Sequence, residues 1–188
     1  YYVNDSVRLL RQMIAQRNGV PPEAVALGSG SSAALVATAI NAGQQGDVLA
    51  PDLFWDTTTL SVERQGIAKI RRLPKHPGLA IDLAAMQAAI DDSISLVQVV
   101  NPNNPTGLLS DAKQLRAFCI AASKKATVLV DEAYNEVTDD PDGNSMVSLV
   151  REGHDVVIAR TFSKIYGLAG MRVGYIIAAP EKIAEIGR

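Results

Sequence analysis

The sequence predicts an α/β protein, a three-layer α/β/α domain built on a mainly parallel seven-stranded sheet. Short apolar runs rich in β-branched residues alternate along the chain with longer segments of helical period. The runs are apolar at nearly every position, as expected of parallel strands that are covered on both faces. With 188 residues, the chain is long enough for one domain with a sizeable core.

Seven of the apolar runs are expected to be strands, because each is short, apolar and bounded by polar or turn-forming residues. They occupy residues 25–27, 47–50, 68–73, 94–100, 127–130, 156–160 and 173–178. Helices are expected in the intervals between them. Val7, Leu10 and Ile14 line one face of the first helix, which Gly19 ends, and an alanine-rich helix follows over residues 31–42.

Two further helices begin at residues that suit an N-cap. Asp82 can cap the helix that follows it, and Ser110 and Asp111 can start one that runs through Phe118. The stretch 139–143, in contrast, is expected to be a polar surface loop.

Composition limits the classes of partner. The residues are 47% hydrophobic and 20% charged, and the net charge is −2. This balance gives no electrostatic reason to expect nucleic acid or an anionic membrane surface as a partner. The apolar runs are too short to cross a bilayer, and no signal peptide is recognisable. Cys119 is the single cysteine, so an internal disulfide is excluded and a reducing, cytoplasmic compartment is expected.

The candidate functional residues follow the expected strands directly. Asn101 follows one strand, Asp131 ends the next, and Thr161 follows another. In sheets of this class ligands collect at the carboxyl ends of the strands, beside the first turns of helices. We therefore expect one site at this edge of the sheet. The histidines, His76 and His154, have no metal-ligand company in the sequence, so no metal site is expected.

Lys164 is the most informative residue of the chain. Thr161 and Ser163 precede it, a glycine-rich stretch follows, and Arg172 comes shortly afterwards. This pattern gathers a nucleophilic amine and several anion-binding groups, which suits a phosphorylated aldehyde. The alternative for a lone lysine in such a string is a solvated surface residue, so the interpretation depends on the rest of the chain.

Two other strand ends have both a structural and a functional interpretation. The loop 101–107 contains two prolines and is either a rigid turn or a support that aims the Asn104 amide at a ligand oxygen. Asp131 at the end of a buried strand needs a compensating partner, such as a protonated ring nitrogen. A helix cap or a salt bridge is the alternative for Asp131.

A small-residue segment precedes the second helix. Residues 28–32 read Gly-Ser-Gly-Ser-Ser, so Ser31 and Ser32 fall where a helix N-terminus offers backbone N–H groups to an anion. The segment lacks the Gly-Lys-Ser/Thr of a Walker loop and the full dinucleotide fingerprint. By itself the segment indicates a phosphate-binding site but does not identify the phosphorylated ligand.

Taken together, these strings resemble the fold-type I pyridoxal phosphate-dependent enzymes, specifically the class I/II aminotransferases of the histidinol-phosphate aminotransferase-like branch. The matching strings are NPNNPTG, DEAY and TFSKIYGLAGMRVGY. The resemblance covers essentially the whole chain, residues 1–188, as the pyridoxal phosphate-binding large domain. It implies that the N-terminal arm and the C-terminal small domain, with the arginine that binds the substrate carboxylate, are absent from this chain.

The resemblance also implies roles for individual residues. Lys164 would form the Schiff base with the cofactor aldehyde and later shuttle a proton. Asp131 would keep the pyridine nitrogen protonated, which makes the ring an electron sink. Asn104 and Tyr134 would hydrogen-bond the phenolic oxygen of the ring. The residues expected at the cofactor phosphate are Ser31, Ser32, Thr161, Ser163 and Arg172.

The resemblance further implies two aromatic contacts with the cofactor, which counting back from Gly66 and Gly19 locates in this sequence. Trp55 is expected over the cofactor ring, with Phe54 as second choice, and Trp55 is otherwise a core or rim aromatic. Tyr2 is expected to complete the phosphate site of a neighbouring subunit, which implies a homodimer.

The implied function is an aminotransferase that moves an amino group between an amino acid and a 2-oxo acid. The alternatives are a decarboxylase or a C–S or β-elimination lyase that uses the same cofactor, and a non-catalytic, cofactor-sensing regulatory domain. Because the substrate-binding parts are expected elsewhere, a chain ending at Arg188 should lack transamination activity even if it holds cofactor.

Overall fold

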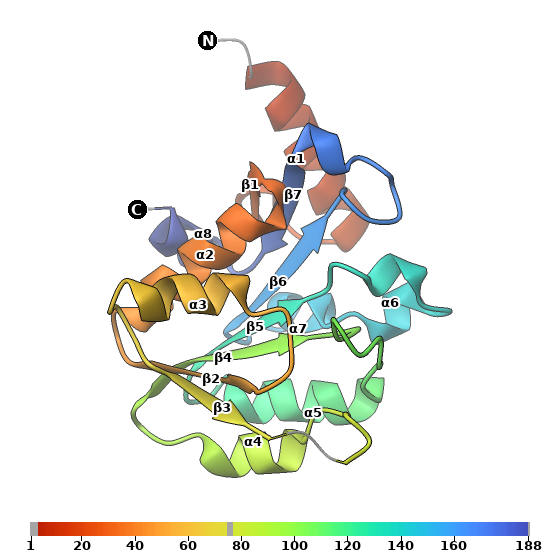
Figure 1. Ribbon diagram of the computed structural model, residues 1–188. Coiled ribbons are helices and arrows are strands. Elements are labelled where there is room, and N and C mark those ends of the chain that lie inside the picture. The colour runs from red at the N-terminus through yellow and green to blue at the C-terminus, as the bar shows by residue number, and fades with distance from the viewer. Residues whose placement is uncertain (1–3, 75–76, 188) are drawn as a thin grey trace.

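The computed structural model describes residues 4–74 and 77–187, and it contains a seven-stranded sheet with helices on both faces (Figure 1). Tyr2 and His76 lie outside the described residues. The strands are β1 (Val25–Ser29), β2 (Asp47–Pro51), β3 (Ile70–Leu73), β4 (Ile94–Val100), β5 (Thr127–Asp131), β6 (Val156–Thr161) and β7 (Val173–Ile177). All seven expected strands are present, with ends that shift by one or two residues.

The strand order is β1-β7-β6-β5-β4-β2-β3. The pairs β2–β3, β2–β4, β4–β5 and β5–β6 are parallel, whereas β7 runs antiparallel to both β6 and β1. The prediction of a mainly parallel sheet is confirmed. Val100 pairs with Asp131, and Asp131 with Ala159, so the carboxyl ends of β4, β5 and β6 meet at one edge.

The helices divide between the two faces of the sheet. They are α1 (Asn4–Asn18), α2 (Gly30–Gly43), α3 (Thr57–Arg64), α4 (Leu83–Ala89), α5 (Ala112–Ala122), α6 (Pro141–Asn144), α7 (Val147–Arg151) and α8 (Pro180–Ile186). One hydrophobic cluster contains residues of α1, α4, α5 and α7, and the other contains residues of α2 and α3, with α8 at its margin. The sheet is therefore the middle of three layers.

One local prediction was wrong. The stretch 139–143 is not a plain loop, because α6 begins inside it. The Asp140 side chain accepts a hydrogen bond from the Gly143 backbone N at 2.9 Å, and Pro141 occupies the first turn, where its missing N–H costs nothing.

Cys119 lies fully buried in the core. Burial raises the pKa of its thiol to about 12, so the thiol stays protonated at neutral pH and acts as a packing group. Among the helices described, none is both long enough and apolar enough to span a membrane.

Candidate active site

A pocket of about 230 Å³ opens at the carboxyl edge of β4, β5 and β6. Every site residue predicted from the sequence contributes to its wall, Tyr2 apart. The lining consists of Ser31, Ser32, Trp55, Val100, Asn104, Asp131, Ala133, Tyr134, Thr161, Ser163, Lys164, Ala169 and Arg172. Strand ends supply the floor, and loops that follow the strands supply the walls, as expected for a sheet of this topology.

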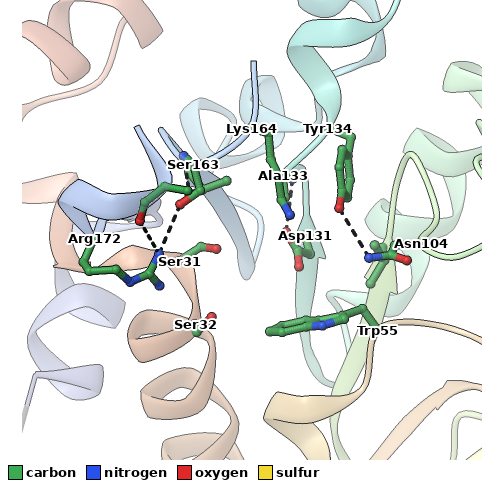
Figure 2. Close-up of a pocket in the computed structure, with 13 residues that line it drawn as sticks. Ser31, Ser32, Trp55, Asn104, Asp131, Ala133, Tyr134, Ser163, Lys164 and Arg172 are labelled. Atoms are coloured by element: carbon green, nitrogen blue, oxygen red, sulfur yellow. Dashed lines mark hydrogen bonds between the residues drawn. The ribbon is translucent and has the colours of Figure 1, made fainter. Parts of the chain in front are cut away.

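Lys164 and Asp131 occupy the middle of the pocket. Figure 2 shows the Lys164 amine directed toward Asp131, with Ser163 and Arg172 on one side and Tyr134 and Asn104 on the other. The Lys164 Nζ lies 5.0 Å from the centre of the Tyr134 ring. Lys164 is solvent-exposed, yet it lines the pocket and its amine is turned toward Asp131.

The Asp131 carboxylate is buried and sparsely hydrogen-bonded. It accepts a hydrogen bond from the Ala133 backbone N at 3.1 Å. Burial raises the pKa of Asp131 to about 6; the Ala133 N–H opposes this, the Glu132 charge adds to it, and the Lys164 ammonium opposes it. A buried carboxylate in this state is stabilised by any cation placed beside it, because a neighbouring positive charge favours the ionised form.

This raised pKa has a consequence for stability. The folded pKa of Asp131, about 6, exceeds its usual value of 3.8, so the folded state holds the proton over a range in which the unfolded chain has lost it. The contribution of Asp131 to the free energy of unfolding of the ligand-free protein should therefore fall as pH rises from about 4 to about 6, by about 3 kcal/mol at most.

Urea denaturation of the wild type and of Asp131→Asn, across this range, tests the expectation. The variant should lack this part of the slope, because its amide does not titrate. Asp139→Asn, at an exposed position, is the matched control and should keep the slope. Identical slopes in the wild type and Asp131→Asn would contradict the assignment.

The other side of the pocket is suited to an anion. The first turn of α2 carries Ser31 and Ser32, and its backbone N–H groups lack intrahelical acceptors. Arg172 Nη1 donates to Ser163 Oγ at 3.4 Å and to the Ala169 carbonyl at 2.9 Å. The Gly30 backbone N donates to the Arg172 carbonyl at 2.9 Å, so the arginine and the helix start are held together. A helix N-terminus beside a guanidinium favours a phosphate or carboxylate group. We call the first turn of α2, together with Ser163 and Arg172, the anion-binding corner.

Two loops form the remaining wall. The Asn104 Nδ2 donates to the Tyr134 hydroxyl at 3.4 Å, which brings two predicted residues into contact. Trp55 lines the pocket, whereas Phe54 is buried in a core cluster, so the first choice between them is the one that the geometry favours.

Several residues near the site were missed by sequence reasoning. Asn103 Nδ2 donates to the Leu53 carbonyl at 3.3 Å and so ties the loop before α3 to the loop after β4. Glu132 and Arg160, each next in sequence to a pocket residue, form a buried ion pair. A signal for the pair was available, since both are charged residues at the ends of otherwise apolar strands. Asn103 gives no comparable signal, because its role depends on a contact with a distant loop.

The sequence matches the model of the aminotransferase class I and II family over residues 2–187, and the chain belongs to this family. The site accords with that class, since a lysine, a buried aspartate and an anion-binding corner meet in one pocket.

Individual relatives refine this picture. The chain is 37% identical to a histidinol-phosphate aminotransferase of Anaeromyxobacter sp., over all of this chain and 51% of the relative. It is 38% identical to an aromatic amino acid aminotransferase of Mycobacteroides abscessus, over all of this chain and 53% of the relative. A crystal structure of histidinol-phosphate aminotransferase from Sinorhizobium meliloti, in complex with pyridoxal-5'-phosphate, superposes with a TM-score of 0.88 at 28% identity, covering all of this chain and 50% of that one. The chain thus spans about half the length of these relatives.

Proposed function

We propose that this chain is the pyridoxal phosphate-binding large domain of an aminotransferase that moves an amino group between an amino acid and a 2-oxo acid. The observation that carries the proposal is the convergence of the Lys164 amine and the buried Asp131 carboxylate in one pocket, beside an anion-binding corner. Family membership over residues 2–187 supports the same activity.

The residues present fit the cofactor. A protonated ring nitrogen would supply the cation that the buried Asp131 carboxylate needs. The first turn of α2, Ser163 and Arg172 would hold the phosphate, together with Thr161. When bound, pyridoxal phosphate supplies an electron-withdrawing ring that stabilises negative charge on the substrate α-carbon.

The side chains of this protein would then bind, orient and transfer protons. Lys164 would hold the cofactor through its amine and later carry a proton at the substrate α-carbon. Asp131 would hold the proton on the ring nitrogen. Asn104 and Tyr134, already in contact with each other, would fix the ring oxygen, and Trp55 would cover one ring face.

Borohydride reduction of the full-length protein with pyridoxal phosphate tests the proposal. Peptide mass mapping should find the cofactor mass on Lys164 and leave Lys182, which is paired with Asp155 far from the pocket, unmodified. Absence of label on Lys164 would refute the proposed function. Measuring transfer of the donor nitrogen to an added 2-oxo acid identifies transamination. Decarboxylation instead releases carbon dioxide, and elimination releases a leaving group and free ammonia.

Substitution of a glycine in β7 tests the role of the anion-binding corner. Gly174 lies so close beneath α2 that an added Cβ would overlap Ser31 N and lie 2.5 Å from Gly30 C. Gly174→Ala should displace the first turn of α2 and weaken pyridoxal phosphate binding by about tenfold or more, equivalent to about 1.4 kcal/mol. The control is Gly170→Ala in the same segment, where an added Cβ meets nothing within 4 Å. Equal cofactor affinities, measured by fluorescence titration, would contradict this account of the corner.

The properties of the whole protein belong to the same proposal. We infer a cytoplasmic homodimer, supported by the single buried thiol and by exposed apolar side chains beside the pocket at Ile165, Tyr166, Leu168 and Met171. Light scattering of the full-length protein tests the dimer. The implied role of Tyr2 stays a prediction. The relatives' names direct the substrate screen toward histidinol phosphate and aromatic amino acids as donors.

A further inference from the structure

Two buried charged residues lie immediately next to active-site residues in the chain. Glu132 follows Asp131, and Arg160 precedes Thr161; Glu132 is 1% exposed and Arg160 is 8% exposed. The Arg160 Nε and Nη2 donate to Glu132 Oε2 at 3.0 and 2.9 Å. Both donors reach the same carboxylate oxygen, and two donors from one planar guanidinium fix orientation as well as charge.

The pair lies on the face of the sheet opposite the pocket. Side chains alternate between faces along a strand. Val130 and Ile158 belong to the cluster under α1, α5 and α7, whereas Leu129 and Val157 belong to the cluster under α2 and α3. Asp131 lies two positions after Leu129, and Thr161 lies four positions after Val157, so both are on the face of the sheet that α2 and α3 cover, which is the pocket side. Glu132 lies two positions after Val130, and Arg160 lies two positions after Ile158, so both are on the face that α1 covers.

The backbone connects the two faces. The Glu132 N donates to the Ala159 carbonyl at 2.8 Å, so the β5–β6 ladder continues beyond Asp131. The ion pair spans these same two strand ends. Any slip between them would displace Asp131 relative to the loop that carries Lys164.

The pair is itself anchored by several elements. Ser145 Oγ donates to Glu132 Oε2 at 2.9 Å and accepts from Arg160 Nη2 at 2.7 Å, while the Met146 N donates to Glu132 Oε1 at 2.7 Å. Arg160 Nη1 donates to Asn18 Oδ1 at 3.4 Å, at the end of α1. A buried network in which the members have partners is rigid and has one preferred arrangement.

The charge of Glu132 also affects the pKa of Asp131 in the pocket. Burial raises the pKa of the Glu132 carboxyl, and Arg160 lowers it. The Glu132 charge in turn raises the pKa of Asp131. Other charged or titratable groups that face the pair are Glu136, whose Oε1 lies 3.8 Å from Arg160 Nη1, the phenol of Tyr175, and the thiol of Cys119, whose pKa the Glu132 charge helps to raise. Arg160 therefore offsets a negative charge that would otherwise act on Asp131 from behind.

We propose that the Glu132–Arg160 pair is a positioning device that braces the ends of β5 and β6 from the face opposite the pocket, and thereby fixes Asp131 against the cofactor ring. The proposal rests on the proposed function, because it assigns Asp131 to the ring nitrogen. Neither residue lines the pocket, so neither is expected to touch substrate.

Conservative variants of the full-length, cofactor-loaded protein test this role. Arg160→Lys keeps the charge but loses the planar pair of donors that both reach Glu132 Oε2, and Glu132→Gln keeps the shape but loses the charge. Each should lower kcat by about 10–100-fold, the scale of a small misplacement at a reacting centre, with little change in KM for the amino donor. Each should also shift the pH midpoint of the bound cofactor's visible absorbance, which a merely structural role would not move.

The controls separate the possible failures. Arg116→Lys and Glu152→Gln alter the half-exposed pair between α5 and the end of α7, and should leave kcat and the absorbance midpoint unchanged. Folded variants of Arg160 and Glu132 with wild-type kcat and midpoint would overturn the proposal. So would activity losses that match only the unfolded fraction measured by circular dichroism. If Glu132→Gln does not fold, Arg160→Lys decides. A wild type that takes no label on Lys164 defeats the proposed function itself, which is a distinct result.

Discussion

Lys164→Ala is expected to remove covalent attachment of the cofactor and to lower turnover by at least about 10²–10⁴-fold. The magnitude is that of losing one positioned proton-transfer group, to which loss of the covalent link would add. The physical basis is the location of the Lys164 amine, which points into the pocket toward Asp131 (Figure 2). No other lysine lines the described pocket, so no neighbouring amine can substitute for it.

Steady-state kinetics of the full-length variant, with mass spectrometry after borohydride treatment, measure both effects. Lys182→Ala is the matched control, since Lys182 pairs with Asp155 at 3.3 Å away from the pocket. It should keep turnover and labelling. A Lys164→Ala variant with wild-type turnover would show that the amine has no catalytic role.

Asp131→Ala is expected to reduce turnover far more than Tyr134→Phe. A carboxylate that faces a pyridinium at about 4 Å is worth roughly 4 kcal/mol at an effective dielectric near 20. Loss of that interaction corresponds to about a thousandfold in rate. The Tyr134 hydroxyl makes a neutral hydrogen bond with Asn104, and such a bond contributes about 0.5–1.5 kcal/mol, or about tenfold at most.

The two variants are compared by kcat/KM for the same donor under saturating cofactor. Saturation matters because Asp131→Ala should also weaken cofactor binding. Asp139→Ala, at an exposed position outside the pocket, controls for the loss of one carboxylate. Equal losses in Asp131→Ala and Tyr134→Phe would reject the ranking, and with it the interaction of Asp131 with a cationic ring.

The extent to which the sequence predicted the site follows from where its residues lie. Lys164, Asp131 and Asn104 sit in contiguous strings at strand ends, and topology alone brings such ends together. α6 and α7 span four and five residues, too few for a helical period to be recognised. The contacts of Asn103 with Leu53 depend on tertiary pairing, which no local pattern encodes.

Strand order and the reversal at β7 were equally beyond local reasoning. An antiparallel strand with one solvated face shows alternating apolar and polar residues, whereas a strand buried on both faces is apolar throughout. The run at residues 173–178 is of the second kind, so its sequence does not reveal that it runs antiparallel to its neighbours. The resemblance ranked Trp55 before Phe54, and packing separates the two residues, because Trp55 lines the pocket whereas Phe54 is buried in a core cluster.

Because β7 runs antiparallel to β6, some pocket residues are brought together by a contact between strands that follow each other closely in sequence, whereas the others depend on contacts between more distant strands. Thr161 pairs with Gly174 across β6 and β7, so the connection carrying Lys164 and Arg172 closes on itself like a hairpin. Asp131 and Asn104 arrive through crossovers that must wait for strands far apart in the chain to meet. Because short closures form faster than long ones, the amine and guanidinium should be in place early on the folding pathway, with the carboxylate docking last.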